Sequence, residues 1–233
     1  MTKITESKPE VYICKYCDKV FKRENTLVVH LCEKKKRWQE KDEKGVRIGF
    51  NAYIKFYEYT QHSTKVKTQM DFIKSPYYKA FVKFGRYCVD INAININKFV
   101  EYVIRQNKKL DYWTSDKLYT DYLNTLVVSE NPIDTSTRAI KYSMKWAEKQ
   151  NTDSKEILRH GNVNSNCYAV TTGHISPWVL YNCNSGKSFL SELSHEQTEI
   201  VWDFINPETW SKKFKDYPED VEYISSMLEK AGW

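Results

Sequence analysis

Residues 12–32 read YICKYCDKVFKRENTLVVHLC, and this stretch decides how the amino-terminal part of the chain folds. Two residues separate Cys14 from Cys17, and twelve separate Cys17 from His30. A pair of thiols followed by an imidazole at this distance is the ligand spacing of a small zinc module. A segment this short cannot bury enough apolar surface to fold by itself, so metal ligation must supply the missing free energy. We therefore predict a Zn²⁺ site at these three residues.

The fourth ligand of this predicted site is less regular. After His30 the nearest candidate is Cys32, with one residue between them, and no other His or Cys occurs before His62. Side chains two positions apart on a regular helix point about 200° away from each other. We expect Cys32 to complete the site, which requires the helix to unwind or to end at His30. The alternative is a reduced hairpin with incidental thiols, and it leaves the whole spacing as coincidence.

The order aromatic-x-Cys-x2-Cys-x3-Phe-x5-Leu-x2-His in this segment resembles the C2H2 zinc-finger family, with Phe21 and Leu27 as the small apolar core. The resemblance covers about 25 of the 233 residues, and it implies a β-hairpin that carries the cysteines and a helix that carries the histidine. One residue between His30 and Cys32 departs from the three to five that are usual, so the segment resembles a variant with three cysteines and one histidine. The string RENTLVVHLC and the Lys/Arg-Trp run after it also resemble fingers of tailed-phage proteins.

The same resemblance implies which side chains face nucleic acid. In the family, residues just before and along the first turns of the helix face the DNA major groove. The residues at or beside these positions are Lys22, Arg23, Asn25 and Thr26. Arginine suits guanine and asparagine suits adenine, but one finger reads only about three base pairs. The resemblance therefore implies DNA contact with little sequence specificity.

Four consecutive cations follow the predicted zinc site. Lys34, Lys35, Lys36 and Arg37 directly precede Trp38. Such a run can neutralise phosphates, and a neighbouring tryptophan can stack on a base or anchor the run. Charged runs are more often the solvated face of a helix. Because this run adjoins a module of the nucleic-acid-binding type, we predict that it contacts the phosphate backbone.

The composition is that of a globular protein with room for a substantial core. The 233 residues are 41% hydrophobic and 28% charged. No run of 18 apolar residues occurs, and the first residues lack an apolar signal segment, so we expect no membrane partner. Three cysteines remain scattered outside the predicted site, which favours a reducing, intracellular setting. We expect the cytoplasm, including that of a phage-infected host cell.

Charge is unevenly distributed along the chain. Residues 1–150 hold 29 Lys and Arg against 18 Asp and Glu, whereas residues 151–233 hold 7 against 12. A basic front and an acidic rear fit a protein that faces a polyanion with one part and a protein partner or solvent with the other.

The remaining sequence contains repeated helix-start signals. Proline follows a helix-capping side chain at 75–76, 131–132, 176–177 and 206–207, and Tyr217-Pro218 continues the series. Ser194-x-x-Gln197 has the form of a capping box, and apolar residues recur every three or four positions. We predict a mainly α protein with an N-terminal ββα zinc finger followed by an all-α helical domain of six to nine helices. The expected division is a flexible N-terminus at 1–10, the finger with its basic helical extension at 11–43, and the helical domain at 44–233.

Two stretches of the helical domain allow a functional interpretation beside a structural one. Residues 53–87 alternate aromatic and cationic side chains, which suits single-stranded nucleic acid, but their helical spacing favours a core of aromatics under surface lysines. Residues 160–186 contain no Asp, Glu, Lys or Arg. Their two histidines and two cysteines could form a second metal site or a Cys–His nucleophile pair. Their spacing matches no common frame, so burial or docking against a partner is the simpler interpretation.

The sequence favours a binding protein over an enzyme, because no P-loop, nucleophile elbow or metalloprotease motif is present. We expect a zinc-dependent, nucleic-acid-binding accessory or regulatory protein of replication or transcription. In this hypothesis the finger and the basic run contact DNA, or else RNA, and the helical body engages a protein partner. Two alternatives stay open: a protein-interaction scaffold in a larger assembly, and a DNA-processing nuclease with an unrecognised active site.

Overall fold

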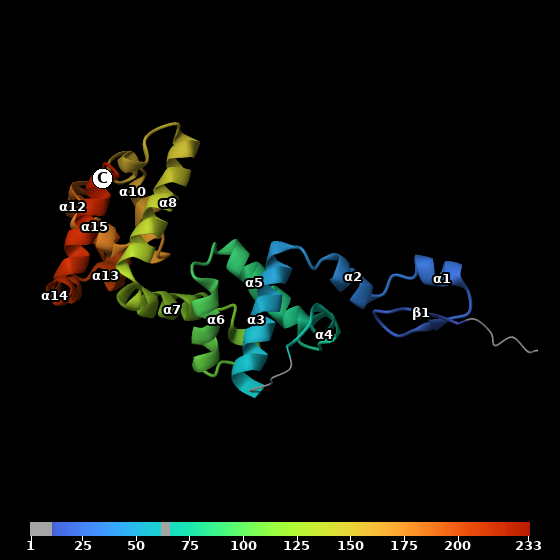
Figure 1. Ribbon diagram of the computed structural model, residues 1–233. Helices are drawn as coiled ribbons and strands as arrows, with labels where there is room; N and C mark the ends of the chain where they lie inside the picture. Colours follow the sequence, from blue (N-terminus) through green and yellow to red (C-terminus); the bar gives the residue numbers. More distant parts are fainter. Residues whose placement is uncertain (1–10, 62–65) are drawn as a thin grey trace, which may run out of the picture. The chain divides into compact units, whose positions relative to one another are not determined.

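The computed structural model describes residues 11–61 and 66–233, so the N-terminus at residues 1–10, which we expect to be flexible, lies outside the described residues. The chain packs as two compact units, Met1–Thr114 and Ser115–Trp233 (Figure 1). It is mainly α, as predicted, and the only strands in the described residues are two of two residues each. None of the described helices is both long enough and apolar enough to cross a lipid bilayer. The predicted domain boundary at residues 43–44 falls inside the first unit and stays a prediction.

The first unit begins with a small hairpin and a short helix. These elements are β1 (Tyr12–Ile13), β2 (Val20–Phe21) and α1 (Glu24–Val29). The strands pair antiparallel, with Tyr12 opposite Phe21 and Ile13 opposite Val20. Because strand side chains alternate between faces, one face carries the half-buried aromatic pair and the other carries the exposed aliphatic pair. Leu27 of α1 is half-buried, so the expected core of this segment is small and incompletely covered.

Five further helices and a 3-10 turn complete the first unit. They are α2 (Glu33–Gln39), α3 (Lys44–Gln61), α4 (Gln69–Lys74), α5 (Tyr78–Asp90), α6 (Ile96–Arg105) and η1 (Leu110–Tyr112). The backbones of α3 and α5 touch, because a Cβ added to Gly85 would lie 1.9 Å from the carbonyl oxygen of Gly45. A Cβ added to Gly49 would likewise lie 2.6 Å from the carbonyl oxygen of Phe81. Only glycine permits so close an approach, so this helix pair depends on it.

Several aromatic side chains of residues 53–87 fill the core of the first unit, whereas Tyr59 and Tyr77 are exposed. Tyr53, Phe72, Phe81 and Phe84 are buried, and the ring of the fully buried Trp113 lies 5.3 Å from that of Phe84. Aromatic pairs at such separations add to the stabilisation that burial alone gives. These rings are therefore covered by protein and cannot stack on bases, which supports the structural interpretation of this stretch.

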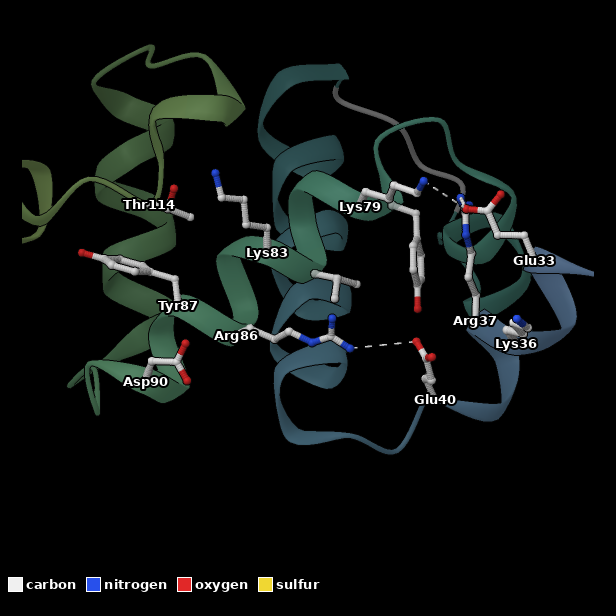
Figure 2. A pocket seen from close by; sticks show the side chains of 12 residues that line it. Glu33, Lys36, Arg37, Glu40, Lys79, Lys83, Arg86, Tyr87, Asp90 and Thr114 are labelled. Atoms are coloured by element: carbon white, nitrogen blue, oxygen red, sulfur yellow. Dashed lines mark hydrogen bonds and ion pairs between the residues drawn. The ribbon is translucent and has the colours of Figure 1, made fainter.

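Arg37 fastens α2 to the rest of the first unit. One guanidinium nitrogen donates to backbone carbonyls at the end of α4, at 2.8 Å for Ile73 and 3.4 Å for Ser75. The guanidinium also lies 4.5 Å from the centre of the Tyr78 ring, and the side chain is only 14% exposed. Two ion pairs connect α2 with α5, and they are Glu33–Lys79 at 3.4 Å and Glu40–Arg86 at 4.0 Å (Figure 2). The position of α2 is thus fixed by tertiary contacts.

The second unit contains helices only, among the residues described. They are α7 (Asp116–Ser129), α8 (Pro132–Gln150), η2 (Ser154–Glu156), α9 (Ile157–His160), α10 (Val163–Thr171), α11 (Pro177–Asn182), α12 (Asn184–Ser191), α13 (His195–Ile205), α14 (Pro207–Asp216) and α15 (Pro218–Lys230). A buried ion pair joins the α7–α8 turn to a later loop. Both terminal guanidinium nitrogens of Arg138 donate to Glu130 at 2.6 and 2.8 Å, and its Nε donates to the carbonyl of Gly173 at 2.8 Å.

Most of the predicted helix starts are confirmed. The side chains of Asn131, Ser176 and Asn206 each accept a backbone N–H of the helix that begins at the following proline. Both hydrogen bonds of the capping box at Ser194 and Gln197 are present. The start at residues 75–76 is displaced, because the chain makes a turn there and α5 begins only at Tyr78.

The number of helices is larger than expected. In the described residues from Lys44 onward there are thirteen α-helices, against the six to nine predicted. Part of the excess comes from the uncharged stretch at 160–186, where capping side chains such as Ser176 and Cys183 begin new helices after a few residues. Hydrophobic periodicity alone does not show such interruptions.

The uncharged stretch at 160–186 is largely interior. Cys167, Trp178, Leu180 and Cys183 are all buried. Burial, helped by the nearby positive charge of Arg138, lowers the pKa of His174 to about 4. In residues 11–61 and 66–233 only one group of three or more potential metal ligands forms, and it lies in the first unit. Burial therefore accounts for the lack of charge over most of the stretch, and the described residues bring no group of three or more potential metal ligands together there.

Candidate metal centre

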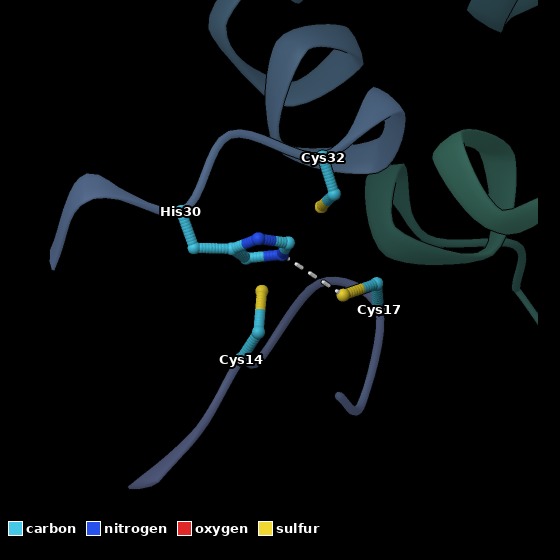
Figure 3. A group of neighbouring side chains, drawn as sticks. All are labelled: Cys14, Cys17, His30 and Cys32. Atoms are coloured by element: carbon cyan, nitrogen blue, oxygen red, sulfur yellow. Dashed lines mark hydrogen bonds between the residues drawn. The ribbon is translucent and has the colours of Figure 1, made fainter. Parts of the chain in front are cut away.

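Four side chains of the first unit converge on one point. The Sγ atoms of Cys14, Cys17 and Cys32 and a ring nitrogen of His30 all lie within 4.8 Å of one another (Figure 3). Cys17 Sγ and His30 Nε2 are 3.3 Å apart. The group comes from the hairpin turn, the end of α1 and the start of α2. Three sulfurs and one imidazole nitrogen at such distances could hold a metal ion.

The hairpin turn brings the first two thiols to the same side. The N–H of Cys14 donates to the carbonyl of Lys19 at 2.9 Å, and the N–H of Asp18 donates back to the carbonyl of Cys14 at 2.8 Å. Asp18 has a φ of 61°, which lies in the left-handed region that Asp and Asn tolerate better than most residues. This conformation closes the turn with Cys14 and Cys17 at its two ends.

The helix ends at His30, which is the condition that the sequence sets for using Cys32. His30 has extended backbone angles, φ −66° and ψ 118°, and its N–H donates to the carbonyl of Leu27 at 3.1 Å. Cys32 is extended too, with φ −97° and ψ 162°. Because neither residue is helical, the angular separation that a helix would impose on them does not apply. The imidazole packs 4.8 Å from the ring of Phe21, which holds it toward the thiols.

Cys32 also begins the next helix. Its Sγ accepts the backbone N–H of Lys35 at 3.4 Å, in the manner of an N-cap side chain of α2. The Lys35 ammonium then reaches back to the carbonyl of His30 at 3.1 Å. The basic helix is thus attached directly to the ligand cluster, with no linker between them.

The pKa values of the thiols in the cluster depend on one another. Burial raises the pKa of Cys14, but hydrogen bonds from the backbone of Cys17 and Tyr16 outweigh it and leave the pKa below its ordinary value. A backbone hydrogen bond from Lys19 lowers the pKa of Cys17, but burial and the neighbouring thiols of Cys14 and Cys32 together raise it. The cluster therefore favours the thiolate of Cys14 and disfavours a second thiolate at Cys17 beside it. A cation in the cluster would remove this repulsion, so metal binding should release protons.

The residues predicted to contact nucleic acid fall into two groups. Lys22, Arg23, Asn25 and Thr26 are all exposed at the start of α1. In α2, Lys36 is exposed and Lys34 is half-buried, whereas Lys35 and Arg37 make the intramolecular contacts described above. The engagement of Arg37 has no sequence signal, because its carbonyl partners lie 36 and 38 residues away.

Two contacts that sequence reasoning missed join the hairpin to the helices. Trp38 of α2 packs against Tyr16 of the turn, with ring centroids 5.9 Å apart. Asp18 pairs with Lys74 at the end of α4, at 3.2 Å. Trp38 therefore acts as the anchor that the sequence allows for, and its ring faces protein.

Comparison with protein-family models, curated proteins and solved structures finds no match to this chain. Function must therefore be inferred from the geometry of the cluster and of the surfaces around it.

Proposed function

We propose that residues 11–43 form a zinc finger with three cysteine ligands and one histidine ligand, and that the protein uses it to bind nucleic acid, with DNA as the expected partner. The observation that carries the proposal is the convergence of Cys14, Cys17, His30 and Cys32 within 4.8 Å. The resemblance of this segment to C2H2 fingers supports the nucleic-acid part of the proposal. Such a protein would serve as an accessory or regulatory component of replication or transcription.

Zinc suits this set of ligands better than magnesium or calcium. A tetrahedral ion with Zn–S bonds of about 2.3 Å places its sulfurs about 3.8 Å apart, so the cluster needs only a small contraction. Soft thiolates disfavour magnesium and calcium, which prefer oxygen ligands. Three thiolates around Zn²⁺ leave one net negative charge, and the Lys35 ammonium lies near it at the carbonyl of His30.

The finger offers a compact set of groups to a nucleic acid. Lys22, Arg23, Asn25 and Thr26 are exposed at the start of α1, and their side chains make no hydrogen bond or ion pair within the described part of the chain. Lys34 and Lys36 add charge from α2. A single reading helix of this length contacts few bases, so the affinity should depend mainly on phosphates and fall steeply with salt.

A fluorescence titration of duplex and single-stranded DNA over a salt series tests the proposal. The zinc-loaded chain should bind with a steep salt dependence, and a zinc chelator should abolish binding. Reversing two charges of the finger, K22E with R23E, should weaken binding about 10-fold or more. The matched control K141E with K149E changes two exposed lysines of α8 and should weaken it far less. The proposal fails if neither chelation nor the finger variant changes the affinity.

One observation favours a second candidate, a finger that binds protein. Six aliphatic side chains of this small segment are more than half exposed, and they are Val11, Ile13, Val20, Val28, Val29 and Leu31. Exposed apolar groups of this density suit a protein partner better than a phosphate backbone. If the zinc-loaded chain shows no salt-dependent affinity for either form of DNA, the interaction scaffold becomes the better proposal. A nuclease has no such support, because the described residues form no second group of potential metal ligands.

A further inference from the structure

A groove lies between α2 and α5 in the first unit, outside the metal cluster. Its volume is about 690 Å³, and Glu33, Lys36 and Glu40 line it from α2, with Lys79, Lys83 and Arg86 from α5 (Figure 2). The buried side chains of Tyr78 and Val82 also contribute to its lining. The groove thus has charged side chains on its two walls, and the two buried side chains add apolar surface between them.

The charges on the walls do not cancel. Five cations and three carboxylates line the groove. Glu33 is paired with Arg37 and Lys79, and Arg86 is paired with Glu43 at 2.7 Å and lies 4.0 Å from Glu40. Within the described residues no ion pair is found for Lys36 or for Lys83, although the two helices that carry them face the same trough. Two such cations on opposite walls of one groove attract an anion that reaches both.

We propose that this groove is a second contact site for nucleic-acid phosphates, in which Lys36 and Lys83 grip the backbone from the two walls. The inference rests on the proposed function and extends it from the finger to the helical part of the first unit. A phosphodiester chain supplies anions at short, regular intervals along one line, which an open trough with cations on both walls can accommodate. A lone small anion would occupy only part of a cavity of about 690 Å³.

A metal ion bound at the cluster would help to hold one wall of this groove in place. Helix α2 starts at Cys32, whose sulfur belongs to the ligand cluster and caps the helix. Loss of the metal frees that end of α2, so the groove should lose its shape together with the finger. By linkage, nucleic acid bound across the groove must raise the affinity of the chain for zinc by the same factor by which zinc raises its affinity for nucleic acid.

The test compares the salt dependence of DNA binding by the full zinc-loaded chain and by the variant K36Q with K83Q. Loss of two phosphate contacts should reduce the slope of log K against log salt by about 1.8 for duplex DNA, or about 1.4 for a single strand. At 0.1 M salt the affinity should fall by up to about 60-fold. The matched control K141Q with K149Q removes the same charge from exposed positions of α8 and should leave the slope close to that of the wild type.

Two readouts make the result decisive. Zinc content and circular dichroism of K36Q with K83Q should equal those of the wild type, because both side chains lie on the surface of the groove. An unchanged slope in this variant, with the wild type binding normally, overturns the groove and removes Lys36 from the phosphate contacts, but leaves intact the contacts proposed for the start of α1. If the wild type itself does not bind, both proposals fall. The single variant K83R keeps the charge and should retain the wild-type slope.

Discussion

Cys32 uses one sulfur for two tasks, as a member of the ligand cluster and as the cap of α2. The two tasks require the same position in space, just beyond the end of α1. They differ in chemistry, because a cap needs only a hydrogen-bond acceptor, whereas zinc needs a thiolate. Substitutions can therefore separate them.

The variant C32S should keep the cap and lose the ligand, since serine is a good N-cap residue. Its zinc affinity should fall about 100-fold or more, because one of four ligands is removed, while the helix content with excess zinc stays close to that of the wild type. The variant C32A should lose both the helix cap and the metal ligand, and its helix content should be lower. Competition with a chromogenic chelator measures the affinity. The control C88A removes a buried thiol of α5 and should bind zinc as the wild type does; equal affinity of C32S and wild type would exclude Cys32 as a ligand.

His174 makes the stability of the second unit sensitive to acid. Its pKa is lowered to about 4 by burial, whereas the unfolded chain holds a histidine near its usual 6.5. Between pH 6.5 and 4 His174 binds a proton in the unfolded state but stays neutral in the folded state. The free energy of unfolding should therefore fall as the pH decreases from 6.5 to 4, by up to about 3 kcal/mol.

Urea unfolding of wild type and H174Q across this pH range measures that contribution. The difference in the free energy of unfolding between the two should change with pH between 6.5 and 4 and be constant above 7. Comparison of two variants is needed because zinc loss adds its own pH dependence in the same range. The exposed His195 provides the control, and H195Q should follow the wild type. Parallel curves for H174Q and wild type would mean that folding leaves the pKa of His174 unchanged, so that the folded and unfolded states take up this proton at the same pH.

At the residue scale the sequence indicates well which side chains form the cluster, and indicates poorly which partners other side chains contact. Cys14, Cys17 and His30 follow from spacing, and even the end of the helix at His30 follows from the geometry that Cys32 requires. The role of Arg37 does not follow, because its partners lie in a different helix. A cation in a basic run looks the same in sequence whether it faces solvent or a buried carbonyl.

At the scale of elements, α2 is a short helix that gains its position from both of its ends. Its start is capped by Cys32, and Arg37 in its last turn binds the carbonyls at the end of α4. A helix of seven residues is marginal alone in water. Its stability must therefore come from these attachments.

The variant R37K tests whether Arg37 is structural. Lysine keeps the charge but cannot reach two carbonyls and lie flat on the Tyr78 ring, so the free energy of unfolding should fall by about 1–3 kcal/mol. Its affinity for DNA at matched salt should change less than about threefold, since the guanidinium is turned toward protein. Urea unfolding and the DNA titration measure the two effects, with K34R as the control. Weaker DNA binding at unchanged stability would instead make Arg37 a phosphate contact.

The elements themselves are well predicted where their signals are local. The caps at Asn131, Ser176 and Asn206 and the capping box at Ser194 mark helix starts because each cap bonds within three residues. The contact between α3 and α5 was not predicted, because it depends on Gly45 and Gly85, which lie forty positions apart. The low glycine content of the chain limits how many close helix–helix contacts of this kind can form, but it does not show which helices make them.

At the scale of the whole chain, the metal centre belongs to one of two compact units. All four candidate ligands and every contact described for α2 lie within residues 1–114. The division at residue 114 has no clear sequence marker, because both sides are helical and neither glycine nor proline is concentrated there. Local sequence patterns predict where the helices are, but they do not predict which helices pack together in each compact unit.

Chelation of the metal should therefore affect the chain unevenly. If the cluster binds zinc as proposed, hydrogen exchange with mass spectrometry should show faster exchange over the finger and α2 after zinc removal, because so short a segment buries little apolar surface of its own. Protection across residues 115–233 should stay the same. Addition of excess zinc should restore the original pattern. A uniform loss of protection over both units would show that the metal centre supports the entire chain.

The attachment of α2 has a mechanical consequence. A rod that is fixed at two points cannot swing about either of them, and α2 is held by the sulfur of Cys32 at its start and by the guanidinium of Arg37 in its last turn. Force applied to the finger would therefore reach α4 and α5 through α2. If the finger binds nucleic acid as proposed, tension on that nucleic acid would reach the aromatic core of the first unit through α2, and the stiffness of this connection would depend on the proposed zinc ion.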